Sequence, residues 1–486
     1  MTVSIVLRPA AFACLCLACT LTVFAQDPFD VVIAGGRVID PESGLDAVRH
    51  VGIRGDRIAA IAESPFTGRE TLDASGFVVA PGFIDLHRHA HGDNAYRYAA
   101  RDGVTSVFEL EIGSADVDGW YRALGPARLI NFGVGAGHIP ARMLVLGDKG
   151  FLLPTGPGRG AATPEQAAEI VATVERGLRE GGVAVGIGLP YTPGASVEEF
   201  DSVVAAAGRH GTFVFAHLGS GAAALDRAFG ITARYKVPLH VAHINSTAGS
   251  EIRAWLDRIG AERRRGADIT AEVYPYTASA TLIESALYDG WEKLPDERFT
   301  QLQWAATGER LTRETFAKYR AQGGSVISHS NTEDALRVGI ANPLPMFGSD
   351  GGRDMDDQPT HPRASGTFAR LLGHYVRDAR VVTLHDALRR ITLEPARRLE
   401  GRVPEMRDRG RIRNGAFADL TVFDPDTVAD GSTYTNAAVF SNGIRHVVVN
   451  GVPIVRGGSF DDKALLFGQR VGVGTRMPGR PIRAPR

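Results

Sequence analysis

The middle of the chain alternates short apolar segments with longer amphipathic ones, and this alternation limits the possible folds more than any other feature. Eight apolar segments have the composition of buried strands: residues 105–108, 129–132, 182–185, 212–216, 239–242, 268–271, 325–328 and 345–348. Helical segments lie between several of them, such as residues 164–180, which Thr163 is suited to cap and Pro164 to begin. Strand–helix repeats build a parallel sheet, and about eight of them favour a closed barrel.

An open doubly wound sheet is the alternative, but no glycine-rich phosphate loop follows the first of these strands. The two ends of the chain carry strand and turn signals instead, with Gly55-Asp56 and Asn450-Gly451 each separating two apolar runs as in a β-hairpin. A barrel needs ~250 residues, so a chain of 486 residues has room for a second domain. We therefore predict an α/β fold with a metal-dependent (β/α)8 TIM-type barrel at residues 84–399, a small β-sandwich built from residues 26–83 and 400–470, and a tail at residues 471–486.

The first 25 residues have the pattern of a secretory signal peptide, which we place at residues 1–25. Arg8 is their only charged residue, an apolar run begins at Pro9, and Ala25 ends a small-residue pattern typical of a signal-peptidase site. The run is too short for a comfortable membrane span. We predict export to the periplasm without stable membrane insertion after cleavage. A lipoprotein acylated at Cys19 is the less favoured alternative, because Cys16 stands where that signal needs leucine.

All three cysteines of the chain, at positions 14, 16 and 19, lie inside this segment. The mature chain is therefore expected to contain neither disulfides nor thiolate metal ligands. Lysine and arginine (54 residues) nearly balance aspartate and glutamate (55 residues). Such a balance indicates neither nucleic acid nor an anionic membrane as partner. A small-molecule substrate is expected, and a homo-oligomer is left open.

The strongest local motif is Ala-Pro-Gly-Phe-Ile-Asp-Leu-His-Arg-His, which runs from Ala80 to His89. Its apolar part has the character of a strand end, and His87 and His89 are two residues apart, so both imidazoles project from one face. Two neutral imidazoles on one face suit a divalent metal. Alone, the pair is weak evidence, because an isolated His-x-His is more often structural.

Three further polar residues each end a separate predicted strand. His217 ends the run 212–216, His243 ends the run 238–242, and Asp350 ends the run 345–349. In a β/α barrel the carboxyl ends of the strands meet at one mouth, where the active site lies. Any one of these residues could be a capped strand end or a core histidine. Together with the histidine pair they predict one shared metal site.

These motifs resemble those of the amidohydrolase superfamily, in particular its N-acyl-D-amino-acid deacylase (D-aminoacylase) branch. The resemblance covers the chain from about residue 30 to residue 458 and implies a metal-bearing β/α barrel beside a small β-sandwich. The shared stretches are Pro-Gly-Phe-Ile-Asp-Leu-His-x-His at 81–89, Gly-Leu-Pro-Tyr-Thr-Pro-Gly at 188–194, Val-Tyr-Pro-Tyr-Thr-Ala-Ser at 273–279, Gly-Ser-Asp-Gly at 348–351, His-Pro-Arg-Ala-Ser-Gly-Thr-Phe-Ala-Arg at 361–370 and Ala-Asp-Leu-Thr-Val-Phe-Asp at 418–424.

The resemblance also implies roles for the candidate residues. His217 and His243 match the two histidines of a tight metal site, and His87 and His89 match those of a second, weaker site. Asp350 matches the aspartate that accepts the proton of the attacking water. Zinc is the implied cofactor, as one or two divalent ions per chain.

The chain departs from the family on the second barrel strand, where a cysteine ligand is common. It has Glu109 and Glu111 there, in Val-Phe-Glu-Leu-Glu-Ile-Gly. Strand alternation turns both carboxylates to one face, and either could replace the thiolate, since oxygen ligands also suit zinc. Glu111 is the preferred ligand because it lies nearer the carboxyl end of the strand. Lys149 and Lys236 do not end strands, so neither is expected to bridge metals.

Other positions concern the substrate. Arg363 resembles the arginine that holds the substrate carboxylate, for which its forked guanidinium is suited. Tyr276 and Tyr191 resemble tyrosines of the substrate pocket. Asn245 stands where the family often has a lysine, which weakens the expectation that the carboxylate is bound in the usual way. His329 could contact the substrate or support the site from behind.

The sequence therefore predicts metal-dependent hydrolysis of a carbon–nitrogen amide bond, and most specifically deacylation of an N-acyl-D-amino acid. The substrate is expected to carry a carboxylate. A cyclic amidase of the hydantoinase or dihydroorotase type would use the same residues, and a carboxypeptidase- or lactonase-like specificity is a further alternative. A catalytically inactive periplasmic binding protein is the alternative from another class. The intact set of histidines with Asp350 argues against it.

Overall fold

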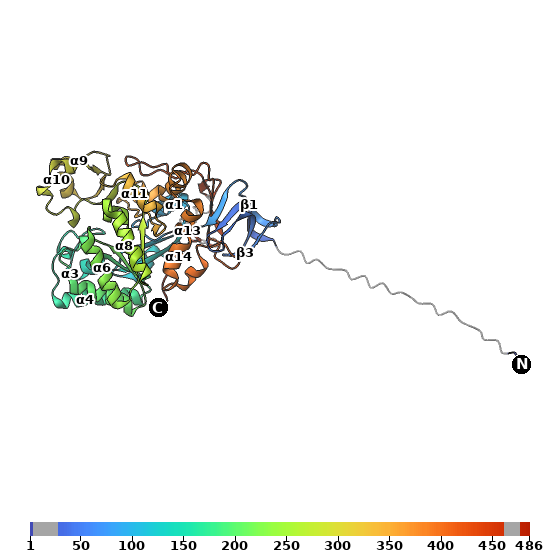
Figure 1. The fold of residues 1–486 in the computed structure, drawn as a ribbon, viewed down its shortest axis with the longest axis horizontal. Helices are drawn as coiled ribbons and strands as arrows, with labels where there is room; N and C mark the ends of the chain where they lie inside the picture. Colours follow the sequence, from blue (N-terminus) through green and yellow to red (C-terminus); the bar gives the residue numbers. More distant parts are fainter. Residues whose placement is uncertain (3–27, 461–476) are drawn as a thin grey trace.

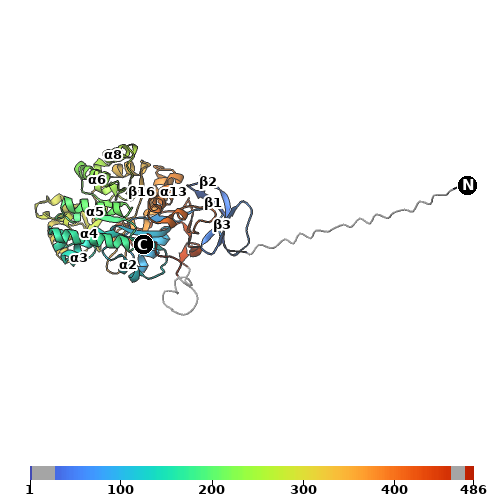
Figure 2. The ribbon, with the colours of Figure 1, turned by 90° about the horizontal axis from the view of Figure 1, so that it is seen from below.

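The structure is a computed structural model that describes residues 1–2, 28–460 and 477–486. Apart from its first two residues, the predicted signal peptide lies outside the described residues. A barrel wrapped in helices makes up most of the molecule, and a strand-rich part that contains β1 and β3 lies at one end (Figures 1 and 2). None of the helices in the described ranges is both long enough and apolar enough to cross a bilayer.

The barrel is a parallel sheet of eight strands, which confirms the predicted fold class. Most of its strands are apolar and fully buried, because helices cover the outside and neighbouring strands fill the inside. In sheet order the strands are β6 (Phe83–Asp85), β7 (Val104–Ser114), β8 (Asn131–Gly137), β9 (Val185–Gly188), β10 (Val214–His217), β11 (Leu239–Val241), β12 (Ile269–Val273) and β16 (Pro345–Phe347).

The edge strands β6 and β16 are joined through the residues that follow them. The backbone N–H of Asp350 donates to the carbonyl oxygen of His87 at 2.8 Å, and that of His89 donates to the carbonyl oxygen of Gly351 at 2.9 Å. Ser349 donates from its backbone and its hydroxyl to the buried carboxylate of Asp85. The barrel therefore closes at its carboxyl end, through the segments that carry three of the candidate site residues.

Helices connect the strands and cover the barrel. The predicted helix after residue 163 is α4, and the hydroxyl of Thr163 accepts a hydrogen bond from Gln166 N, as expected for its cap. The helices around the barrel are α1 (Asp93–Arg101), α2 (Val117–Leu124), α3 (His138–Leu146), α4 (Pro164–Arg179), α5 (Val197–Arg209), α6 (Ala222–Tyr235), α7 (Ile244–Ala248), α8 (Ile252–Arg264), α11 (Glu333–Ala341), α12 (Arg363–Arg370), α13 (Leu384–Ile391) and α14 (Leu393–Glu400).

A second sheet takes its strands from both ends of the described chain, as predicted. Its order is β20-β19-β18-β17-β5-β1-β2-β3, with β4 also paired to β1, and its apolar side chains form a core of their own. The strands are β1 (Phe29–Asp40), β2 (Leu45–Arg54), β3 (Arg57–Ala62), β4 (Gly68–Asp73), β5 (Val78–Pro81), β17 (Leu420–Phe423), β18 (Ile444–Val449), β19 (Val452–Arg456) and β20 (Ser459–Phe460).

The turn predictions in this sheet have different outcomes. Gly55-Asp56 joins β2 to β3 and Asn450-Gly451 joins β18 to β19, which confirms both hairpins. The sequence pair Gly35-Gly36 also predicts a turn, and this prediction is wrong, because β1 continues through the pair with a bulge. Gly35 has a φ of 71°, which a residue without a side chain adopts at little cost. The glycine pair therefore bends one strand.

A small antiparallel sheet lies between β12 and α11 in the sequence. It consists of β13 (Ser279–Leu282), β15 (Ser325–Ser328) and β14 (Leu302–Trp304), and helices α9 (Asp296–Thr300) and α10 (Arg313–Gln322) pack with it around a separate apolar core. The prediction that residues 325–328 form a barrel strand is wrong. Only the two central residues of β15 are fully buried, as suits a strand in a surface subdomain, and β6 takes the barrel position instead.

Candidate metal centre

His87 and His89 leave the end of β6 with their side chains on one side of the chain. Their Nε2 atoms lie 3.2 Å apart. The backbone N–H of His87 donates to Asp85 Oδ1 at 3.2 Å, so the same carboxylate that closes the barrel also holds the start of the motif. The predicted pair of imidazoles on one face is therefore present.

Glu111 on β7 joins all four candidate histidines. Its Oε2 lies 3.2 Å from His87 Nε2 and 3.1 Å from His89 Nε2. Its Oε1 lies 2.8 Å from His217 Nδ1 and 2.9 Å from His243 Nε2. The carboxylate that sequence reasoning preferred thus lies between two pairs of imidazoles.

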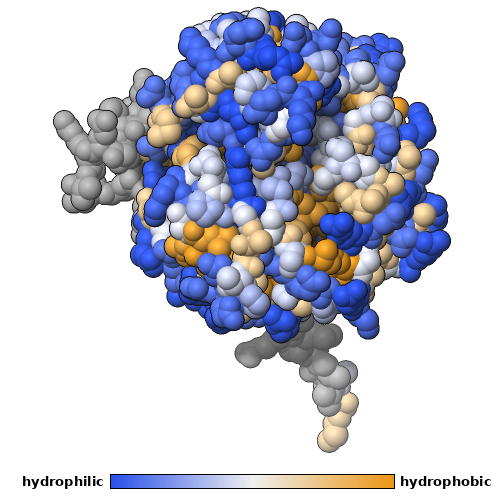
Figure 3. Space-filling model, turned by 90° about the vertical axis from the view of Figure 1, so that its left-hand side faces the viewer, coloured by the Kyte–Doolittle hydropathy of each residue, from blue (hydrophilic) through white to orange (hydrophobic). Residues whose placement is uncertain are grey.

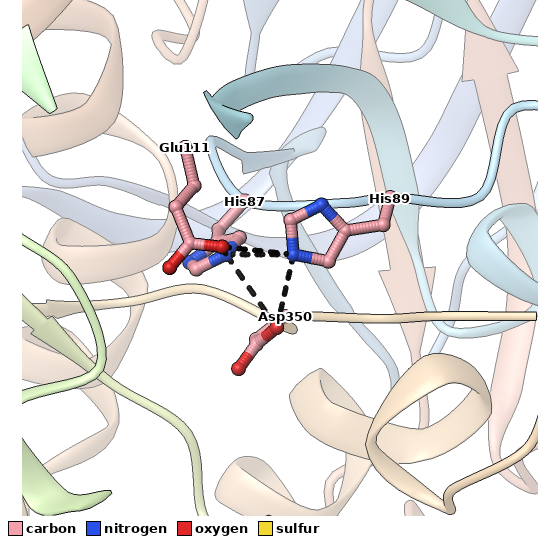
Figure 4. A group of neighbouring side chains, drawn as sticks. All are labelled: His87, His89, Glu111 and Asp350. Carbon is pink, nitrogen blue, oxygen red and sulfur yellow. Dashed lines mark hydrogen bonds and ion pairs between the residues drawn. The ribbon is translucent and has the colours of Figure 1, made fainter. Parts of the chain in front are cut away.

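Asp350 follows β16 and completes the first of these groups. Its Oδ1 lies 3.2 Å from His89 Nε2 and 3.5 Å from His87 Nε2, as Figure 4 shows together with Glu111. Asp350 has a φ of 49° and His243 a φ of 28°, and residues other than glycine rarely adopt positive φ values. Such conformations persist where the surrounding structure requires them, and they are common at functional sites.

Two further carboxylates hold the outer nitrogens of the first histidine pair. Glu272, on β12, lies in hydrogen-bond contact with His87 Nδ1. Glu109, on β7, lies 2.8 Å from His89 Nδ1 and also accepts the backbone N–H of Ile112. Glu109 is therefore not an alternative to Glu111 in the centre of the cluster, because it contacts His89 from the opposite side of the ring.

These contacts determine which atoms the histidines present. In their neutral forms, His87 and His89 donate Nδ1–H to the outer carboxylates and leave the Nε2 lone pairs free. These lone pairs face Glu111 Oε2 and Asp350 Oδ1 with no hydrogen-bond donor among them. Four converging acceptors repel one another unless a cation lies between them. The donor set therefore fits a divalent metal ion.

Glu111, His217 and His243 form a second group of the same kind. His243 Nδ1 lies 3.0 Å from the hydroxyl of Thr247, which leaves Nε2 to face Glu111. Glu111 belongs to both groups, so the arrangement can hold one ion or two ions bridged by a carboxylate.

The electrostatics of the cluster also favour positive charge. Burial lowers the pKa of His87, but the neighbouring carboxylates, Asp350 foremost, outweigh burial and raise it well above its usual value. Burial raises the pKa of Glu111, but the imidazoles outweigh burial and hold it well below its usual value. For Glu272, His87 and His240 overcome burial and lower the pKa to about 2. The carboxylates of Glu111 and Glu272 therefore stay ionised.

A cavity of about 430 Å³ opens beside the cluster, between the barrel mouth and the small sheet. The face of the molecule drawn in Figure 3 is mostly hydrophilic, with separate hydrophobic patches. The cavity reaches His89, Glu111, His217, His243 and Asp350, and its wall also includes Phe151, Leu153, Tyr191, Leu282, Arg298, Arg353 and Arg363. Its mixed lining suits a small molecule with both an apolar and an anionic part.

The predicted substrate residues differ from one another in their position relative to the cavity. Arg363 and Tyr191 line the cavity, and the Tyr191 ring packs edge-on against His217 with centroids 4.8 Å apart. Tyr276 is not among the described residues of the cavity wall, and its hydroxyl donates to Asp430 Oδ2 at 3.1 Å instead. The expected substrate contact of Tyr276 stays a prediction, and its hydroxyl is bound to a carboxylate of the protein. His329 Nε2 lies 2.9 Å from Oε1 of Gln303, which belongs to β14 of the small sheet.

Sequence reasoning missed Glu272 and Asp85. Each is a buried carboxyl in a short apolar strand, Glu272 in β12 and Asp85 at the end of β6. An ionised acid is rarely buried without a partner. An acidic residue inside an apolar strand of the predicted barrel could therefore have indicated a functional role. The sequence does not show which histidine or hydroxyl such an acid contacts.

The comparisons with known proteins agree with this site. The model of the amidohydrolase family matches residues 293–455. An N-acyl-D-glutamate deacylase of Alcaligenes xylosoxydans xylosoxydans is 30% identical, over 88% of this chain and 94% of its own length. The chain belongs to the amidohydrolase family. A D-aminoacylase of the same organism is 31% identical, over 88% of this amidohydrolase and 95% of its own length.

A solved structure agrees with the fold of this amidohydrolase. It is the crystal structure of N-acyl-D-glutamate deacylase from Bordetella bronchiseptica, complexed with zinc and a phosphonate inhibitor that mimics the tetrahedral intermediate. The TM-score is 0.78 at 27% identity, and the match covers 94% of this chain and 100% of that one. The predicted membership of the D-aminoacylase branch is confirmed. The protein is a metal-dependent hydrolase that acts on linear amides.

Proposed function

We propose that this amidohydrolase removes the acyl group from an N-acyl-D-amino acid, which yields a carboxylate and a free amino acid. The observation that carries the proposal is the placement of the Glu111-centred ligand cluster, Asp350 and Arg363 on one cavity. Relatives that share most of the chain's length are an N-acyl-D-glutamate deacylase and a D-aminoacylase. The choice of the D-enantiomer rests on those relatives.

Zinc is the proposed cofactor, as one or two ions per chain. His87, His89, Glu111 and Asp350 would hold one ion, and Glu111, His217 and His243 would hold the other. Bound there, a divalent cation makes water a nucleophile near neutral pH and polarises the acyl oxygen. Imidazole and carboxylate donors are those that zinc hydrolases use.

Asp350 is the proposed proton acceptor. As water adds to the acyl carbon, one of its protons moves to the Asp350 carboxylate. The carbon–nitrogen bond then breaks and the same proton passes to the leaving nitrogen. One water is consumed, its oxygen stays on the acyl product, and the amine leaves neutral. Burial raises the pKa of Asp350, but Arg363 and His87 outweigh burial and lower it, which keeps the carboxylate ionised for this task.

Arg363 is the proposed partner of the substrate carboxylate. Its Nη2 donates to the carbonyl oxygen of Ala280 at 3.0 Å and its guanidinium lies 4.7 Å from the Tyr274 ring centroid, which fixes its position. Its Nε is buried and has no hydrogen-bond partner among the described residues, and the residue lines the cavity. Asn245, at the position where the family often has lysine, contacts the backbone of Tyr274 instead. Arg363 therefore takes over the carboxylate that a lysine would otherwise hold.

The test is turnover by the mature enzyme before and after removal of metal. We expect a chelator to abolish hydrolysis of N-acetyl-D-amino acids and zinc to restore it, with the L-enantiomers hydrolysed more slowly. Unchanged turnover in chelated enzyme would exclude the metal mechanism. Preferred turnover of hydantoins or dihydropyrimidines would identify a cyclic amidase instead. Less than about one metal ion per chain together with no turnover would favour an inactive binding protein.

The cellular context is also a proposal. The apolar segment before Ala25 supports export to the periplasm, and the near-neutral charge supports a small-molecule substrate without nucleic acid or membrane partners. N-terminal sequencing and mass of the protein from a periplasmic fraction would test cleavage after Ala25. A lipid-modified Cys19 in the membrane fraction would establish the lipoprotein alternative. Sedimentation of the purified protein would show whether it forms a homo-oligomer.

A further inference from the structure

We propose that the first divalent cation binds at His87, His89, Glu111 and Asp350, and that the group of His217 and His243 fills second and more weakly. This order is the reverse of the one that the family resemblance implies. The inference rests on the proposed metal-dependent function, but it concerns the order in which the two groups bind metal and not the substrate.

The two groups differ in the number and charge of their ligands. The first offers four ligand atoms from two imidazoles and two carboxylates, and the second offers three from two imidazoles and the shared carboxylate. Asp350 supplies the additional negative charge, with Oδ1 3.2 Å from His89 Nε2. Attraction between a divalent cation and a buried carboxylate is strong at such distances. Arg363 offsets part of this charge from the far oxygen of Asp350.

The two groups also differ in the residues that contact the histidine nitrogens facing away from the metal, and this further favours metal binding at the first group. His87 and His89 each contact a buried carboxylate through Nδ1, from Glu272 and Glu109. A carboxylate in that position fixes the ring orientation and makes Nε2 a stronger ligand. His243 has only the neutral hydroxyl of Thr247 there. Among the described residues, no carboxylate other than Glu111 lies within ion-pair distance of His217.

Glu272 is itself held in place. Its Oε2 lies 3.4 Å from His240 Nε2, and His240 Nδ1 lies 2.8 Å from the hydroxyl of Thr270. A side chain at Gly348 would meet Glu272 Oε2 at 2.5 Å, so the glycine provides the space that the carboxylate occupies. Of the two groups, Glu272 contacts an imidazole nitrogen only in the first, at His87, and it meets His243 through the backbone N–H alone. We therefore treat Glu272 as a positioning residue that acts through the His87 ring.

Because both groups use the Glu111 carboxylate, binding of one cation weakens the binding of the other. Once a cation binds at the first group, part of the charge of this carboxylate is neutralised, and a second cation nearby is repelled. The second cation is then held by two imidazoles, one oxygen of the shared Glu111 carboxylate, and solvent. We expect two separate binding steps when zinc is added.

The experiment is a titration of metal-free mature protein with Zn²⁺, followed by calorimetry, with anomalous diffraction from crystals that hold one equivalent. We expect the first ion between His87 and His89. Glu272→Gln, which keeps the side-chain volume, should weaken the first step about 10- to 100-fold. The second step should change much less, because the amide oxygen of glutamine can still accept the backbone N–H of His243, which lies 3.5 Å from Glu272 Oε1. Thr247→Val is the matched control on the other group and should weaken only the second step.

The outcomes separate this inference from the proposed function. A first ion at His217 and His243, equal filling of both groups, or an unaltered first step in Glu272→Gln would overturn the inference, even if the enzyme hydrolyses N-acyl-D-amino acids. The expected order of binding in a protein that hydrolyses none of these compounds would leave the inference standing and overturn the proposed function. The anomalous diffraction uses the unaltered chain, so it does not depend on the folding of a variant.

Discussion

Arg363 Nη1 lies 2.8 Å from Asp350 Oδ2, and both side chains are buried at the barrel mouth. The residue proposed to bind the substrate carboxylate therefore also contacts the proposed proton acceptor. The other oxygen of Asp350 faces His87 and His89. One carboxylate thus connects the substrate-binding side of the cavity to the metal-binding side, and changes at Arg363 should affect both.

Asp350→Asn tests the proton acceptor. The amide keeps the shape and an oxygen for the cluster but cannot take a proton from water, so kcat should fall about 10²- to 10⁴-fold. The measurement is kcat for an N-acetyl-D-amino acid in zinc-loaded enzyme, with the metal content of each preparation determined. An Asp350→Asn variant with normal metal content and normal kcat would remove Asp350 from this role.

Arg363→Ala tests the connection between the two side chains. Without the guanidinium the pKa of Asp350 should rise, because burial is then opposed mainly by His87. The ionised carboxylate is the active form, so activity is present above this pKa and is lost as the pH falls through it. The acid limb of kcat/KM should therefore move to higher pH. Loss of a charged hydrogen bond to substrate should also lower kcat/KM about 10- to 100-fold.

Arg353→Ala is the control for this profile. Arg353 also lines the cavity, but its ion-pair contact is with Asp357, 3.6 Å away. The acid limb should stay in place in this variant, whatever happens to KM. An acid limb that stays in place in Arg363→Ala, or that moves equally in both variants, would contradict a specific effect of Arg363 on Asp350.

The fold could be predicted from the sequence to the extent that it depends on local pattern. Alternation of apolar and amphipathic segments identifies buried strands and covering helices, but it does not identify strand partners. Residues 325–328 have an apolar centre, as a barrel strand does, and the antiparallel pairing of β15 with β13 and β14 depends on residues far away in the sequence. β6 has only three residues and follows β5 almost directly, so no composition signal separates the two.

The site could be predicted where its residues end strands. His217, His243 and Asp350 are such residues, and the barrel brings them together. Glu272 could not be assigned a partner, because the contact with His87 is set by the packing of β12 against distant strands. Tyr276 shows that a shared motif does not by itself tell which of its side chains reaches the site. It lies in a family motif two residues from Tyr274, but only Tyr274 contacts Arg363, and Tyr276 packs against the loop that carries Asp430.

The two tyrosines can be separated by substitution. Tyr191→Ala should raise KM about 10-fold, because the ring forms part of the cavity wall and its removal forfeits about 1.5 kcal/mol of apolar contact. Tyr276→Phe should leave KM unchanged and lower the free energy of unfolding by about 1 kcal/mol, since it loses the hydrogen bond to Asp430. Steady-state kinetics and urea unfolding measure the two effects. A raised KM in Tyr276→Phe with normal stability would restore this residue to the substrate pocket.

A buried histidine away from the metal centre should make stability depend on pH. His138, at the start of α3, is fully buried, and its Nε2 lies 2.6 Å from Glu199 Oε1. The same carboxylate receives two hydrogen bonds from Arg142. Burial lowers the pKa of His138 and Glu199 only partly opposes it, while Arg142 adds to the lowering. His138 is therefore neutral in the folded protein and donates Nε2–H to Glu199.

The sign of the pH effect follows from this state. Below about pH 6.5, the usual value for histidine, the unfolded chain binds a proton that the folded chain does not, so the free energy of unfolding falls with decreasing pH. His138→Gln keeps a donor for Glu199 but does not titrate, so its loss of stability between pH 7.5 and pH 5 should be smaller than that of the unaltered chain. Urea unfolding in zinc-containing buffer at both pH values measures this. His385→Gln, at an exposed position, should behave like the unaltered chain, and equal pH dependence in all three proteins would show that His138 takes up a proton in the folded state.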